Sequence, residues 1–134
     1  MCDTGLFITL AFWDKSFTEN IIYEKLLGDK LPANLGYVYE NLVAQMLIAA
    51  GNELYYHTWP RDEKHYYEMD FLLSRGAKIC PVEVKSSSSK THASLDEFCS
   101  IHSSRILWRY LVYTKDFAKD RETTMIPAYM VPFL

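Results

Sequence analysis

The stretch Pro81-Val82-Glu83-Val84-Lys85 decides how the middle of this chain folds. Its valines alternate with charged residues, and successive side chains of a β-strand point to opposite faces of a sheet. The alternation therefore predicts a strand that buries Val82 and Val84 on one face. Glu83 and Lys85 then lie together on the other face, between apolar segments where simple solvation explains a charged pair poorly.

Extended segments lie on both sides of this strand. The residue types predict strands at 53–59, 66–73, 77–85 and 106–113, and a further short strand at 126–131. The 106–113 segment is largely apolar, so we expect that strand to be buried on both faces.

Helices are predicted before and between the strands. Apolar residues at helical spacing indicate a helix at 35–50, which ends at Gly51-Asn52, and another at 94–102. Two shorter helices are expected between residues 4 and 27. This order of elements predicts an α/β fold, in which a small mixed β-sheet is flanked by helices.

Length and composition indicate a single domain over residues 1–134, with a helical lead-in at 1–34 and a core at 35–134. The chain is 49% hydrophobic and 15% aromatic, which is enough apolar material for a core. It has no run of ~18 uncharged apolar residues, so we expect no membrane-spanning helix. The net charge of −3 argues against a strongly basic nucleic-acid-binding surface, although a local basic patch stays open. The oligomeric state also stays open.

The cysteines and histidines argue against a disulfide framework and against a zinc site. Cys2, Cys80 and Cys99 are widely separated without CxxC spacing, and the four histidines lack HExxH spacing. Free thiols are typical of a reducing compartment, so we expect a cytoplasmic protein. The sequence also lacks the glycine motifs of a P-loop and of a Rossmann turn.

Asp70 and the Glu83–Lys85 pair together form a candidate metal-binding site. A tight turn over residues 74–77 would place Asp70 opposite residue 81, diagonal to Glu83 on the same face and ~7–8 Å from it. Two carboxylates so arranged suit a hard divalent cation, Mg²⁺ or Mn²⁺. We expect Asp70 and Glu83 to hold the metal, and Lys85 to orient a water or to neutralise charge developing on a phosphate.

Glu40 is the fourth candidate residue. On the predicted 35–50 helix its neighbours are mostly apolar or small, and burial of an acid there is unfavourable unless something pairs with it. The metal site or Lys85 would supply that partner, so we expect Glu40 to support the site through the metal or a water.

Plainer interpretations of these features stay open. The Glu83–Lys85 pair, or Glu68 bridging to Lys85, could be a surface ion pair that contributes under ~1 kcal/mol. Strand aromatics such as Tyr56 and Tyr66 could stack nucleic-acid bases, although such residues more often form core or cross-strand pairs.

The four candidate residues form a pattern over three predicted elements. Glu40 lies on a helix, Asp70 on a strand, and Glu83-Val84-Lys85 on the next strand. This pattern resembles the PD-(D/E)xK superfamily of restriction-endonuclease-like nucleases. The resemblance implies a Mg²⁺-dependent nuclease that hydrolyses phosphodiesters of DNA or RNA, with metal binding by Asp70 and Glu83 and catalytic roles for Lys85 and Glu40.

A second resemblance covers nearly the whole chain. Four blocks carry it in order: Asp3-Thr4-Gly5-Leu6, residues 36–43, residues 68–73 and residues 81–86. They resemble a domain family of unknown function that usually forms the C-terminal part of bacterial and archaeal AAA-type ATP-binding proteins. An ATPase module is therefore the expected partner. Since it is absent from the printed sequence, we expect a fragment or a shortened form of a longer protein.

A non-catalytic module of such an ATPase is the alternative function. The same fold would then serve regulation, DNA docking or subunit contact, and the polar residues would form a structural network. The surface around Lys85 distinguishes the two: a basic rim that includes Lys90, Arg105 and Arg109 favours nucleic acid, whereas an apolar rim favours a protein contact.

Overall fold

The computed structural model of the chain describes residues 3–11, 35–86 and 92–134. The first of the two helices expected between residues 4 and 27 is α1, Thr4–Ala11, and the second lies outside the described residues. Lys90 lies outside them as well. Asp3 caps α1, because its Oδ1 accepts a hydrogen bond from the Leu6 amide.

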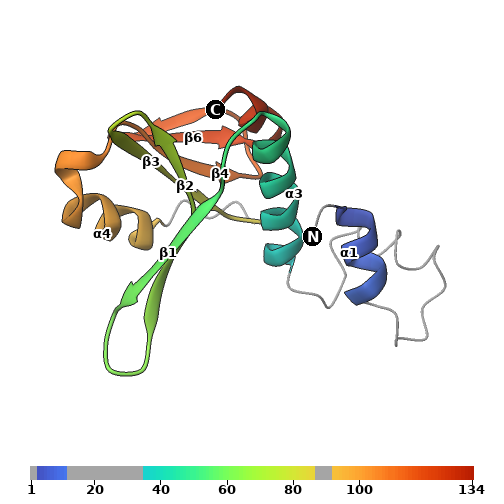
Figure 1. The fold of residues 1–134 in the computed structure, drawn as a ribbon, viewed down its shortest axis with the longest axis horizontal. Coiled ribbons are helices and arrows are strands. Elements are labelled where there is room, and N and C mark those ends of the chain that lie inside the picture. The colour runs from blue at the N-terminus through green and yellow to red at the C-terminus, as the bar shows by residue number, and fades with distance from the viewer. Residues whose placement is uncertain (1–2, 12–34, 87–91) are drawn as a thin grey trace.

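Six strands form one mixed sheet in the order β1-β2-β3-β4-β6-β5 (Figure 1). The strands are β1 (Tyr55–Pro60), β2 (Tyr66–Arg75), β3 (Lys78–Val84), β4 (Arg109–Tyr113), β5 (Ala118–Asp120) and β6 (Thr123–Pro127). β3, β4 and β6 run parallel to one another, while β1–β2, β2–β3 and β5–β6 pair antiparallel. The expected α/β architecture is confirmed.

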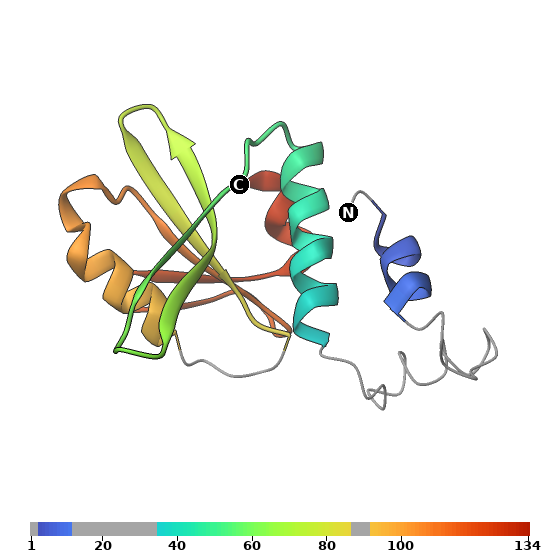
Figure 2. The ribbon, with the colours of Figure 1, turned by 60° about the horizontal axis from the view of Figure 1, so that its bottom comes forward.

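Helices cover the two faces of this sheet (Figure 2). α3 (Leu35–Ala49) packs on one face together with the 3₁₀ segment η2 (Ala128–Phe133). α4 (Ala93–Ile101), followed by the short 3₁₀ turn η1 (Ser103–Arg105), packs on the other face against β2 and β3. α4 also provides the crossover that joins the parallel strands β3 and β4.

The alternation in β3 produces the two-sided core. Val82 and Val84 join the α3-side cluster with Val43 and Leu47 of α3. The α4-side cluster contains Met69, Leu95, Phe98 and Cys99. Glu83, between the two valines, therefore points to the α4 side.

Two strand predictions are corrected in their bounds. β4 begins at Arg109, and Ile106 makes only an isolated bridge to Ile79 while Trp108 is exposed. Burial on both faces thus holds only for residues 111–113. The predicted strand at 126–131 is instead the end of β6 followed by η2, because a short apolar run has no period that separates a strand from a buried turn.

The β2–β3 hairpin corrects the predicted register. Gly76, at φ +63°, lies in the turn, and Arg75 pairs with Lys78. Phe71 consequently lies opposite Val82, so Asp70 lies level with Glu83 and not with residue 81 as expected. The tight turn is one residue further along the chain than predicted, because glycine accepts the left-handed backbone conformation.

A bulge interrupts the β1–β2 pairing beside Asp70. Tyr55 lies opposite Leu72 and His57 opposite Met69, so Asp70 and the residue after it both face the single residue Tyr56. The extra residue shifts the alternation of β2, and Met69 and Leu72 pack on the same side although they are three positions apart.

Candidate functional site

Asp70 lies where β2 and β3 separate. Beyond the Phe71–Val82 pair, the Val84 amide donates a hydrogen bond to Asp70 Oδ2 at 2.7 Å. The carboxylate therefore occupies the gap between the two strands. The bulge in β2 and this hydrogen bond together fix its position.

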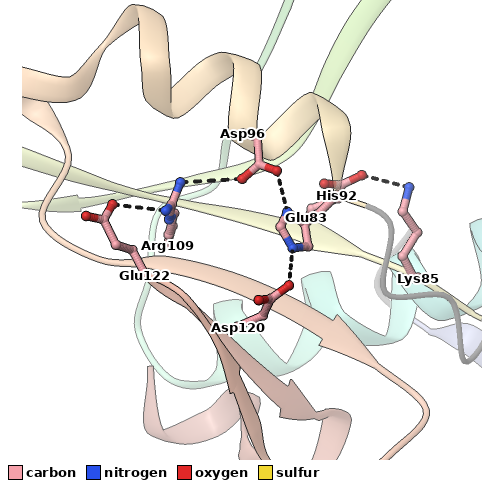
Figure 3. Close-up of polar contacts among 7 residues, drawn as sticks. All are labelled: Glu83, Lys85, His92, Asp96, Arg109, Asp120 and Glu122. Carbon is pink, nitrogen blue, oxygen red and sulfur yellow. Dashed lines mark hydrogen bonds and ion pairs between the residues drawn. The ribbon is translucent and has the colours of Figure 1, made fainter.

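Glu83 and Lys85 form an ion pair next to this gap. Lys85 Nζ lies 2.7 Å from Glu83 Oε1, and the Glu83 residue is only 3% exposed (Figure 3). The second oxygen, Oε2, is buried and has no hydrogen-bond partner among the described residues. An unpaired carboxylate oxygen in a buried position is unfavourable, so this atom can accept a further partner.

Glu40 of α3 lies near Asp70 on the α3 side of the sheet, whereas Glu83 faces the α4 side. The prediction that Asp70 and Glu83 share one face is therefore wrong, because the bulge in β2 shifts the alternation of its side chains. A pocket of about 310 Å³ opens between α3 and the β1–β2 hairpin, and Glu40, Glu68 and Asp70 line it together with Tyr55 and Tyr56. We call Glu40, Glu68, Asp70, Glu83 and Lys85 the carboxylate cluster.

Two carboxyls of this cluster, Asp70 and Glu40, have a raised pKa. Burial raises the pKa of Asp70 to about 7, and the charges of Glu40 and Glu83 add to the rise, while the Val84 hydrogen bond and Lys85 oppose it. Burial, followed by the charge of Glu68, also raises the pKa of Glu40, and Lys85 lowers it. Asp70 thus lies within electrostatic range of Glu40, Glu83 and Lys85, and this single cation does not balance the acids.

The cluster has the chemistry of a cation site without a complete ligand cage. The described part of the chain contains no group of three or more His, Cys, Asp or Glu side chains that could hold a metal ion. The predicted ligands are two, Asp70 and Glu83, and Mg²⁺ is commonly held by one or two carboxylates with waters and substrate oxygens completing its shell. The free Oε2 of Glu83 and the excess of negative charge fit such an ion.

The rim of this pocket is aromatic and acidic. None of its lining residues is basic: they are Glu40, Leu54, Tyr55, Tyr56, Glu68, Asp70 and Phe71. Tyr56 is 74% exposed and stands at the pocket edge. The basic rim that would favour nucleic acid is therefore absent from the lining of this pocket, and Arg109 lies elsewhere, in ion pairs with Asp96 and Glu122.

A second polar group, which the sequence did not indicate, surrounds Arg109 (Figure 3). Arg109 approaches Asp96 at 3.5 Å and Glu122 at 2.9 Å. The buried His92 lies 2.9 Å from Asp96 through Nδ1 and 3.4 Å from Asp120 through Nε2. We call these five residues the charged network. They come from α4, β4 and the β5–β6 hairpin, so no short motif could have identified them.

Comparisons with known proteins identify one family. The model of DUF4143, a domain of unknown function, matches residues 35–131, which include every predicted site residue. The searches of curated proteins and of solved structures gave no match. Among the described helices, none has the length and apolar character needed to cross a membrane.

Proposed function

The chain belongs to the DUF4143 family, and from the chemistry of its carboxylate cluster we propose that it is a divalent-cation-dependent phosphodiesterase acting on DNA or RNA. The observation that carries the proposal is the crowding of acids around Asp70, whose pKa is raised to about 7. Perturbed carboxyls beside a buried unpaired oxygen are typical of functional sites. Glu40 lies on a helix, Asp70 on a strand and Glu83 on the next strand, with Lys85 directly after it. This placement supports the proposal by its resemblance to the PD-(D/E)xK nucleases.

Asp70 and Glu83 are the residues that would hold Mg²⁺ or Mn²⁺. A bound divalent cation would polarise a phosphate and lower the pKa of a coordinated water. Asp70 keeps one oxygen on the Val84 amide, which fixes its orientation, and Glu83 keeps Oε2 free. Both carboxylates therefore remain able to accept a ligand while their positions are set by the sheet.

Lys85 and Glu40 would act on the reacting groups. The Lys85 ammonium is held at the site by Glu83 and is 36% exposed, so it can donate a hydrogen bond to a water or a phosphate oxygen. Glu40, whose pKa burial and Glu68 raise, can accept a proton from a water at the pocket surface.

Calorimetric titration with Mn²⁺ and with Mg²⁺ tests the proposal. We expect wild-type protein to bind, and Asp70→Asn to weaken binding by at least about tenfold, because one carboxylate ligand is worth more than 1.4 kcal/mol. Asp116→Asn, an exposed acid outside the cluster, is the matched control and should bind like wild type. Equal binding by Asp70→Asn and wild type would overturn the proposal.

A cleavage assay then separates catalysis from metal binding. Single- and double-stranded DNA and RNA are incubated with Mn²⁺ and wild-type protein or Lys85→Met. We expect cleavage by wild type and its loss in Lys85→Met, with metal binding retained.

The acidic, aromatic rim favours a second candidate function. A pocket edge formed by Tyr55 and Tyr56, with no basic lining residue, suits a protein contact better than a phosphate backbone. On this alternative the domain is a non-catalytic module that regulates or docks a partner, such as an AAA-type ATPase. Metal binding without cleavage of any of the four substrates would favour it.

A further inference from the structure

A larger pocket lies away from the carboxylate cluster, between α4 and the β5–β6 hairpin. Its volume is about 580 Å³, and Arg109 of β4 is among the residues that line it. Pockets of ~300–1,000 Å³ are typical of small-molecule sites. The nuclease-like function makes no use of this pocket, so it needs an explanation of its own.

Two lining cations of this pocket are unpaired. Lys119 and Arg121 make no ion pair and no side-chain hydrogen bond with the residues that the structure describes. Arg109, by contrast, is held by Asp96 and Glu122. The pocket therefore has two positive charges available on the β5–β6 hairpin, besides Arg109, whose charge Asp96 and Glu122 balance.

Arg121 occupies a backbone position that suits glycine. Its φ is +53°, and it is the only non-glycine residue with positive φ in the described part of the chain. A side chain in this left-handed conformation is strained, and such strain gathers at functional sites. The β5–β6 turn thus accepts a cost to place an arginine on the pocket wall.

The third feature is an exposed aromatic wall. Trp108 lines the pocket next to Leu107 and is 57% exposed, although tryptophan is highly buried on average. An indole face of this kind can stack on a planar ring. Two free cations and one free indole match a ligand that joins a compact dianion to an aromatic ring.

We propose that this pocket binds a nucleoside monophosphate group, with the phosphate between Lys119 and Arg121 and the base on Trp108. A phosphate monoester carries about −1.5 to −2 charges at neutral pH, which the two cations balance. Asp96 on the α4 wall and Glu122, which follows Arg121 in the β5–β6 turn, disfavour a longer polyphosphate chain. The group belongs either to a free nucleotide or to the phosphorylated end of a nucleic-acid strand. The inference does not depend on the carboxylate cluster.

The test uses AMP, adenosine, inorganic phosphate, and a short oligonucleotide with and without a 5′-phosphate, titrated by tryptophan fluorescence and by calorimetry. We expect AMP to bind at least about tenfold more tightly than adenosine or inorganic phosphate, because only AMP contacts both the two cations and the Trp108 indole. Tight binding of AMP identifies a free nucleotide as the source. Preferential binding of the 5′-phosphorylated oligonucleotide identifies a strand end.

Arg121→Gly is the decisive variant, because it removes the cation and relieves the backbone strain together. We expect AMP affinity to fall at least about tenfold while the melting temperature rises. Trp108→Leu should weaken AMP binding and remove the fluorescence change. Lys115→Gln, an exposed lysine that does not line the pocket, is the charge-matched control and should bind AMP like wild type.

Two results would overturn the inference. One is unchanged AMP and oligonucleotide binding in Arg121→Gly. The other is that wild-type protein, titrated to millimolar ligand, binds neither AMP nor the 5′-phosphorylated oligonucleotide more tightly than it binds inorganic phosphate.

Discussion

The carboxylate cluster and the charged network lie on the same sheet but differ in how their charges are paired. In the network, Arg109 stands between Asp96 and Glu122, and His92 stands between Asp96 and Asp120. In the cluster, four acids share the single cation Lys85. Acids that alternate with an arginine and a histidine are the pattern of a structural network. Crowded like charges cost stability unless a partner of opposite charge relieves them.

The pH dependence of stability offers the sharpest test of this contrast. The folded-state pKa of Asp70 is about 7, above its ordinary value of 3.8, so between these two pH values the folded protein holds a proton that the unfolded chain releases. The stability that this carboxyl contributes is complete at low pH and is lost as the pH rises through about 7. We expect the free energy of unfolding in EDTA to fall by roughly 2–3 kcal/mol from pH 5 to pH 8.5.

Asp70→Asn supplies the comparison for that measurement. The amide cannot ionise, so urea titrations of the variant should show a much flatter pH profile over the same range. Addition of Mg²⁺ to wild type at pH 8.5 should restore part of the lost stability, because an ion that binds only the folded state shifts the equilibrium toward it. If the free energy of unfolding changed with pH in the same way for both proteins, the crowding of acids around Asp70 would not cost stability, and the contrast with the charged network would be wrong.

Removal of Arg109, the central cation of the charged network, should destabilise the fold. Arg109→Met leaves Asp96 and Glu122 without their shared partner and removes a side chain that is 14% exposed. We expect the protein to lose about 1–2 kcal/mol, measured by thermal or urea unfolding at neutral pH. Arg105→Met, an exposed arginine without an ion pair among the described residues, should change stability by less than about 0.5 kcal/mol. A neutral effect of Arg109→Met would mean that the network contributes nothing to the fold.

The smallest expected effect concerns Glu40. Burial and the charge of Glu68 raise its pKa, so neutralisation in Glu40→Gln removes an unfavourable ionised form. We expect a gain of about 0.5 kcal/mol at pH 8 without metal, and weaker Mn²⁺ binding. Glu97→Gln, on the exposed side of α4, is the matched control. A loss of stability in Glu40→Gln would place Glu40 among the structural residues.

The sequence predicted those parts of the fold that rest on local periodicity. The alternation of Val82 to Lys85 specified β3 and its faces, and the apolar stripe specified α3. The same alternation put Glu83 beside Lys85, which the 2.7 Å ion pair confirms. Placement of Glu40 and Asp70 near this pair also agrees with the structure, whereas the roles of all four residues stay predictions.

What the sequence could not predict depends on irregular or distant contacts. The turn at Gly76 moved the β2–β3 register by two residues, and a bulge then changed the side to which β2 residues point. Strand β5 is only three residues long and carries no alternation to detect. The charged network assembles from segments joined only by the fold, so its members have no fixed spacing in sequence.

The bulge at Asp70 also makes chain length matter as much as residue identity. Removal of one residue there would let β1 and β2 pair without interruption. The side chains on one side of the bulge would then turn to the opposite face of the sheet, relative to those on the other side. A related chain with such a deletion would keep Asp, Glu and Lys in its motif while losing the carboxylate from the gap between the strands. Family members that retain this site are therefore identified by the number of residues between the Asp and the Glu and Lys of the motif, and not by the presence of these residues alone.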